Sequence, residues 1–145
     1  MPPALRDPDD PAEWLRRARS NLARARADRG IPDVLFEDLC FDAQQAAEKA
    51  LKGLLVHRRL AFPRTHVVTE LLTLLTQGGV DVPDEVRQAG ILTQYAVQAR
   101  YPWAAEDVAP AEYVRAVDLA EGVVRWVEGY LLPPRAAQAT NPDSS

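Results

Sequence analysis

The chain has few of the residues that disulfides and metal sites require. Its 145 residues include one cysteine and two histidines. The single cysteine, Cys40, excludes an intrachain disulfide and a metal site built from cysteines alone. His57 and His66 have no carboxylate at a spacing that would make a convincing ligand pair. A glycine-rich phosphate loop is missing as well, because Gly78-Gly79 has no strand before it. We therefore expect neither a bound metal nor a cofactor.

Long apolar runs and a large net charge are also missing. No segment has the length and hydropathy of a membrane span, and the first residues lack the pattern of a signal peptide. The formal net charge of -4 excludes a globally basic nucleic-acid binder. We expect a soluble cytoplasmic protein with one domain over residues 11–132. Residues 1–10 and 133–145 are expected to be a disordered lead-in and a disordered tail.

What the chain does have is a series of amphipathic patterns separated by proline and glycine. Apolar residues recur at spacings of three and four, and no segment alternates as a half-buried strand does. Asp10 and Thr65 are the expected caps of the first and third helices. The predicted helices span about residues 11–29, 32–59, 67–77, 83–100 and 110–132. Because the connections are short, the sequence predicts an all-α, antiparallel up-and-down helical bundle of about five helices, four main and one shorter.

The predicted helix over residues 32–59 is the centre of this bundle. One face is apolar and rich in alanine, which allows a neighbouring helix to approach closely. Cys40 lies on this face and is predicted to be buried. The opposite face is polar and charged but also carries Phe41 and Val56, which do not belong on a fully solvated surface. We expect Phe41 and Val56 to form an interface, with another helix of the chain or with a second subunit.

The first candidate binding cluster lies on that opposite face. Glu48 and Lys52 have the spacing and order of a favourable helical ion pair. Gln45, Lys49 and Lys52 bring hydrogen-bond donors and positive charge to one side of the helix. The alternative interpretation is an ordinary exposed face with a salt bridge.

Two further clusters stand next to predicted helix ends. Arg64 and His66, in Pro63-Arg64-Thr65-His66, would assist anion binding at a helix N-terminus, or the segment is a structural turn. Arg100 and Tyr101 follow the fourth helix, where the alternative is a cation that interacts with the helix dipole. Six arginines also give the first helix a strongly positive outer face, either solvated or in contact with phosphate or an acidic partner.

The central segment resembles the signature of the HEPN domain, a helical domain of prokaryotes and higher eukaryotes associated with nucleotide binding. The resemblance covers about residues 11–132 and is carried by FDAQQAAEKALKGLLVHRRLAFPRTHVVTELL. The matching positions are Phe41, Gln44 to Lys52, Pro63 to His66, Leu71-Leu72 and, further along, Arg100-Tyr101-Pro102.

The resemblance implies a helical bundle that commonly dimerises and that prokaryotes often encode beside a minimal nucleotidyltransferase, in a toxin–antitoxin-like pair. Many HEPN domains are metal-independent ribonucleases whose arginine is followed, after about four to six residues, by a histidine late in the bundle. Arginine then holds the scissile phosphate and histidine moves the proton of the attacking 2′-hydroxyl. Here no histidine follows Arg100. Arg59 and His66 have the spacing, but they flank the turn at Pro63 between the second and third helices.

The sequence therefore favours a non-catalytic HEPN protein, a homodimer that binds a nucleotide, a nucleotidyltransferase partner, or both. The candidate nucleotide- or anion-binding residues are Gln45, Lys49, Lys52, Arg64, His66, Arg100 and Tyr101. The alternative is a divergent ribonuclease toxin that uses His66 with Arg59 or Arg100, so enzymatic activity is left open. A third hypothesis is an adaptor whose first helix meets an acidic partner. The identity of the nucleotide or RNA, the partner and the stoichiometry are not fixed by the sequence.

Overall fold

The protein is a bundle of helices, as the sequence predicts. A computed structural model describes residues 8–27, 31–101 and 107–132, so the expected terminal segments lie almost entirely outside the described residues. No strand occurs in these three ranges. The elements are α1 (Pro11–Arg26), α2 (Phe36–His57), α3 (Val68–Gln77), α4 (Asp84–Arg87), a 3-10 helix η1 (Gln88–Leu92), α5 (Thr93–Arg100) and α6 (Pro110–Leu131).

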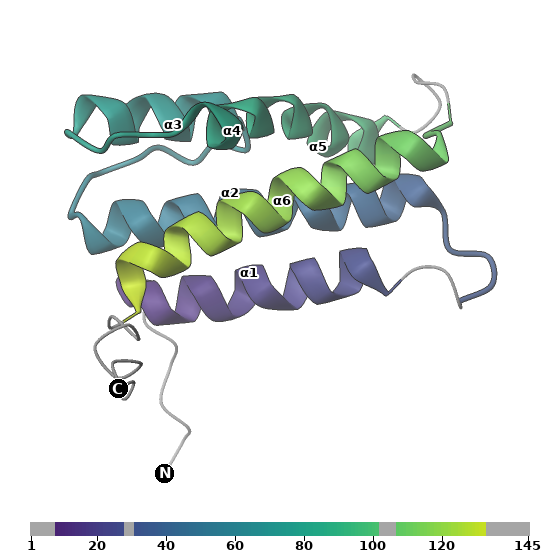
Figure 1. Cartoon of the computed structure of the whole chain (residues 1–145), viewed down its shortest axis with the longest axis horizontal. Coiled ribbons are helices and arrows are strands. Elements are labelled where there is room, and N and C mark those ends of the chain that lie inside the picture. The colour runs from purple at the N-terminus through teal and green to yellow at the C-terminus, as the bar shows by residue number, and fades with distance from the viewer. Residues whose placement is uncertain (1–7, 28–30, 102–106, 133–145) are drawn as a thin grey trace, which may run out of the picture.

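The helix α2 lies in the middle of the molecule (Figure 1). It runs antiparallel to α1 on one side, and the layer formed by α3, α4 and α5 covers its other side. The long helix α6 crosses α2 obliquely and packs against both α2 and α1. The central position predicted for α2 is therefore confirmed.

Local chemistry explains where the first two helices begin. Asp10 accepts a hydrogen bond from the amide of Ala12 at 2.9 Å, and Pro11 occupies the first turn, so the predicted cap of α1 is confirmed. The second helix was expected to begin near residue 32, but it begins at Phe36. Asp33 has a φ of 67°, a left-handed conformation that forms a turn and cannot continue a right-handed helix.

The predicted fourth helix, over residues 83–100, is divided into α4, η1 and α5. Tightening to a 3-10 helix occurs around Gly90, where α3 approaches closely. A Cβ at Gly90 would lie 2.6 Å from Thr69 Oγ1, so a larger residue at position 90 would require the exposed Thr69 side chain to move. The expectation of one continuous helix was wrong, because apolar periodicity alone does not report such an approach.

The core surrounds α2 and includes Cys40, which is fully buried as predicted. Burial, together with the nearby charge of Glu112, raises the pKa of the Cys40 thiol to about 12. At the other end of α2, Gly53 allows α1 to pack closely, since a Cβ there would lie 2.9 Å from Trp14 Cβ. None of the described helices combines the length and apolarity needed to cross a membrane.

The arginines of α1 do not form the strongly positive face that was expected. Carboxylates from α1, α2 and α6 accompany every one of them within the described residues. The pairs are Arg16 and Arg17 with Glu13, Arg19 with Glu128, Arg24 with Asp42, and Arg26 with Glu121. Folding therefore largely neutralises this surface, because the sixth helix brings acidic residues from far along the chain.

Candidate functional site

A buried polar network occupies the side of α2 that faces α3 and α5. Its centre is the carboxylate of Glu48, which accepts hydrogen bonds from Gln44 Nε2 and Lys52 Nζ, each at 2.8 Å. His66 Nδ1 lies 3.0 Å from Glu48 Oε1 and joins the network from the α2–α3 loop. Gln44 also reaches the carbonyl oxygen of His66 at 3.4 Å. Side chain and backbone of His66 are thus both attached to α2.

The predicted pairing of Glu48 with Lys52 is present, but the pair is not on an exposed face. Glu48 is 3% exposed and Lys52 is 8% exposed. Burial alone would raise the pKa of Glu48, but hydrogen bonds from Lys52, His66 and Gln44 outweigh it and lower that pKa. The alternative of an ordinary exposed face does not hold for this pair, because the loop of residues 58–67 folds over this turn of α2.

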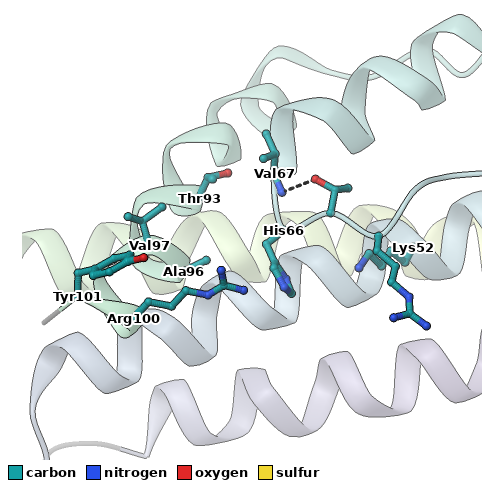
Figure 2. A pocket seen from close by; sticks show the side chains of 10 residues that line it. Lys52, His66, Val67, Thr93, Ala96, Val97, Arg100 and Tyr101 are labelled. Carbon is teal, nitrogen blue, oxygen red and sulfur yellow. Dashed lines mark hydrogen bonds between the residues drawn. The ribbon is translucent and has the colours of Figure 1, made fainter.

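Two members of the network, Lys52 and His66, line a pocket of about 650 Å³ between α2, the α2–α3 loop and α5, which we call the cation pocket. Figure 2 shows Arg100 extending from the end of α5 toward His66, with Tyr101 beside Val97. The lining residues are Lys52, Arg64, Thr65, His66, Val67, Thr93, Ala96, Val97, Arg100 and Tyr101. Five of the seven predicted binding residues therefore lie together.

The two arginines of the cation pocket differ from those of α1. Arg64 and Arg100 are exposed, and neither forms an ion pair with any residue that the structure describes. Lys52 is already paired with Glu48, and His66 is held by the same carboxylate. The positive charge available to a ligand in this pocket therefore belongs to Arg64 and Arg100.

The other two predicted binding residues, Gln45 and Lys49, lie outside the cation pocket. Gln45 Nε2 donates to Gln44 Oε1 at 2.8 Å, so Gln45 is connected to the buried network through Gln44. Lys49 points toward α1, where its Nζ donates to Asn21 Oδ1 at 2.8 Å. Burial and neighbouring arginines lower the pKa of Lys49 against the opposing effect of nearby carboxylates. Sequence spacing placed Lys49 beside Lys52, but the two side chains leave α2 in different directions.

The helix N-terminus beside the pocket is built differently from the prediction. Thr65 is not the cap of α3, which is Val67. Thr65 Oγ1 accepts from the amide of Val67 at 3.0 Å, and the amide of Val68 donates to Thr93 Oγ1 on α5 at the same distance. The first bond lies within the loop, and the second holds the start of α3 against α5. The role of Thr93 was missed because nothing in the sequence pairs it with residue 68.

Arg59 lies in a second pocket, of about 630 Å³, which we call the aromatic pocket. Trp14, Val56 and Phe62 contribute to its lining, and His66 does not. Arg59 and His66 therefore occupy different pockets despite their spacing in the sequence. Of the two predicted interface residues, Val56 lines the aromatic pocket, and both Phe41 and Val56 are only partly buried by their own chain.

The described residues contain no group of three or more histidine, cysteine, aspartate or glutamate side chains placed to hold a metal ion. The chemistry of the cation pocket is thus that of guanidinium, imidazole and ammonium groups.

Comparison with known proteins places this architecture in a family. The sequence profile of the HEPN domain matches residues 11–130. The chain belongs to the HEPN family. The crystal structure of an archaeal HEPN homologue is similar to this HEPN chain, with a TM-score of 0.64 and 26% sequence identity. The similarity covers 83% of this chain and 97% of the archaeal one. None of the curated proteins compared with the chain matches it.

Proposed function

We propose that this HEPN protein binds the phosphate groups of a nucleotide in the cation pocket and acts without catalysing a reaction. The observation that carries the proposal is that Arg64 and Arg100, both without a carboxylate partner in the described structure, line one pocket. Guanidinium groups bind phosphate with two parallel hydrogen bonds, which makes unpaired arginines a suitable recognition element.

The remaining lining suits the rest of a nucleotide. Tyr101 is 54% exposed and Val97 is 56% exposed, so a base has an aromatic ring and an apolar surface on which to stack. Exposed apolar side chains next to unpaired cations are typical of a site that recognises a ligand with both kinds of surface.

Calorimetric titration with ATP and GTP tests this proposal. Arg64→Gln and Arg100→Gln are each expected to weaken binding about ten- to one-hundred-fold, since hydrogen bonds to charged groups contribute about 1.5–3 kcal/mol. Arg115→Gln is the matched control, because Arg115 is exposed on α6 and lines a different pocket. The absence of binding by the unmodified protein, alone and with its partner, would exclude nucleotide recognition.

We further propose a homodimer that pairs with a minimal nucleotidyltransferase in a toxin–antitoxin-like system. Support comes from Phe41 and Val56, which are only partly covered by their own chain, and from family membership. Phe41→Gln is expected to weaken the dimer in analytical ultracentrifugation, while Val114→Gln on α6 leaves it intact. Co-purification with a nucleotidyltransferase encoded next to this chain tests the second partner. A monomer at all concentrations would contradict the dimer.

A divergent metal-independent ribonuclease is the second candidate function, and one observation favours it. Arg100 and His66 line the same pocket, and Glu48 holds His66 through Nδ1. With Nδ1–H donating to the carboxylate, Nε2 of the neutral ring keeps a lone pair, and the side chain is 55% exposed. Such an imidazole is placed to accept the proton of a 2′-hydroxyl while Arg100 holds the phosphate.

This second candidate predicts RNA cleavage in the presence of a chelator. His66→Ala and Arg100→Gln would abolish the cleavage, and His57→Ala at the exposed end of α2 would not. Cleavage that survives His66→Ala would assign the activity to another group or to a contaminant.

A further inference from the structure

The aromatic pocket lies next to the cation pocket, because a lining side chain of one contacts a lining side chain of the other. Lys52 lines the cation pocket, Phe62 lines the aromatic pocket, and Lys52 Nζ lies 5.8 Å from the centre of the Phe62 ring. On α2, Lys52 and Val56 are one turn apart on the same face, a rise of about 6 Å. The two pockets are therefore neighbours along α2, with the Lys52 and Phe62 side chains between them.

The loop that borders both pockets carries positively charged side chains and no negatively charged ones. Residues 58–67 contain three arginines, one histidine and no carboxylate. Arg59 is exposed in the aromatic pocket, and Arg64 is exposed in the cation pocket. Neither forms an ion pair with a described residue, in a chain whose formal net charge is -4. Asp9 contributes the one carboxylate among the described residues that line the aromatic pocket.

The aromatic pocket also offers surfaces for a planar group. The rings of Trp14 and Phe62 meet edge to face with centroids 6.3 Å apart, and both are partly exposed. Aromatic rings next to arginine, along a positively charged surface, are the elements with which proteins hold single-stranded nucleic acid.

We propose that the aromatic pocket is a second subsite, and that the ligand of this protein is a single-stranded nucleic acid of at least two nucleotides. One phosphate lies between Arg64 and Arg100, and the next nucleotide enters the aromatic pocket with its phosphate near Arg59 and its base against Phe62. This inference rests on the proposed binding of phosphate in the cation pocket.

The test compares AMP with a tetranucleotide of adenosine in titrations of the full chain. The tetranucleotide is expected to bind about five- to one-hundred-fold more tightly than AMP, because each stacked base contributes about 1–3 kcal/mol. Phe62→Leu removes the ring and keeps an apolar side chain, and Arg59→Gln removes the charge. Each is expected to reduce the ratio of the two affinities toward one.

Salt dependence gives an independent measurement of the phosphate contact. Removal of one phosphate-binding cation lowers the slope of log affinity against log salt by about 0.7 for a single strand. Arg59→Gln should show this change with the tetranucleotide. Arg58→Gln is the matched control, because Arg58 is the neighbouring exposed arginine and lines neither pocket. Melting temperatures of all variants verify that Phe62→Leu is folded.

The outcomes separate this inference from the function on which it rests. If AMP binds and the tetranucleotide binds no more tightly, the second subsite is overturned and the nucleotide site stands. If neither binds, the proposed function itself fails. Equal effects of Arg59→Gln and Arg58→Gln would also overturn the subsite. Inorganic polyphosphate that binds as tightly as the tetranucleotide would overturn the role of the aromatic rings.

Discussion

Nδ1 of His66 lies 3.0 Å from Oε1 of Glu48, which joins the α2–α3 loop to the middle of α2 across 18 positions of sequence. The same carboxylate binds Lys52 and Gln44. One buried acid therefore holds the floor of the cation pocket and also fixes the loop that carries Arg59 and Arg64.

Glu48→Gln is predicted to destabilise the protein by about 3–5 kcal/mol, because it leaves the buried ammonium of Lys52 without a counter-charge. Urea denaturation measures the change. Glu70→Gln, at an exposed position of α3, is the control and should stay within about 0.5 kcal/mol of the unmodified protein. The double variant Glu48→Gln/Lys52→Met should recover most of the loss. If Glu48→Gln were as stable as the control Glu70→Gln, the buried ion pair of Glu48 and Lys52 would contribute nothing to stability.

Stability is predicted to fall in acid through the same residue. The pKa of Glu48 in the folded protein is below its ordinary value, so the unfolded chain binds the proton more tightly. The stabilising contribution is therefore complete above the unfolded-state pKa of about 4.3 and is lost as pH falls through the lower folded-state value. Urea midpoints measured from pH 6 to pH 3 test this. The slope should be smaller in Glu48→Gln, and an unchanged slope would contradict the prediction.

The fold could be predicted from the sequence because helix ends are local. Asp10-Pro11 and Gly78-Gly79 mark boundaries through their own backbone chemistry, and the apolar face of α2 follows from its spacing. The site could be predicted only in part. A helical pattern shows that Glu48 and Lys52 share a face, but it does not show that a loop covers that face.

Contacts between distant residues are the part that sequence patterns do not contain. Lys49 turns to Asn21 on α1, and Arg26 meets Glu121 on α6, neither of which any local spacing indicates. Arg64 and Arg100 line the same pocket for the same kind of reason, because α5 packs on α2 and is hydrogen-bonded to the start of α3. The sequence predicted them as two separate clusters at helix ends, whereas in the folded protein they line one pocket.

Two glycines, Gly53 at the crossing of α1 and α2 and Gly122 in α6, are predicted to respond oppositely to substitution by alanine. Gly53→Ala should destabilise by about 1–3 kcal/mol, because the new methyl group would lie 2.9 Å from Trp14 Cβ and 3.4 Å from the carbonyl oxygen of Pro11. Gly122→Ala, in α6 with open space around it, should stabilise by about 0.5–1 kcal/mol. Thermal denaturation compares the two. A neutral Gly53→Ala would mean that α1 can shift away at little cost.

Two residues that follow α2 and α3 give a second pair of substitutions with opposite expected effects on stability. Arg59 and Gly79 both have positive φ, 59° and 92°, and each is the second residue after its helix. Arg59→Gly is expected to stabilise by about 0.5–1 kcal/mol, since glycine has no Cβ to strain this conformation. Gly79→Ala is expected to destabilise by about 1 kcal/mol from backbone strain alone, because no atom lies within 4 Å of its added Cβ. Chemical denaturation tests both, and destabilisation by Arg59→Gly would show that its side chain contributes to folding.

The single cysteine of the chain, Cys40, can report opening of the core through the rate at which its thiol is labelled. Cys40 is fully buried and its pKa is about 12, so a thiol reagent reacts with it only when the core around α2 opens. When reclosing is fast, the labelling rate divided by the rate for an exposed cysteine gives the opening equilibrium without any substitution. A ligand that binds only the closed protein lowers the opening equilibrium, and it slows labelling by the factor 1 + L/Kd, where L is the free ligand concentration. Occupancy of a surface pocket would then be read from an atom in the interior.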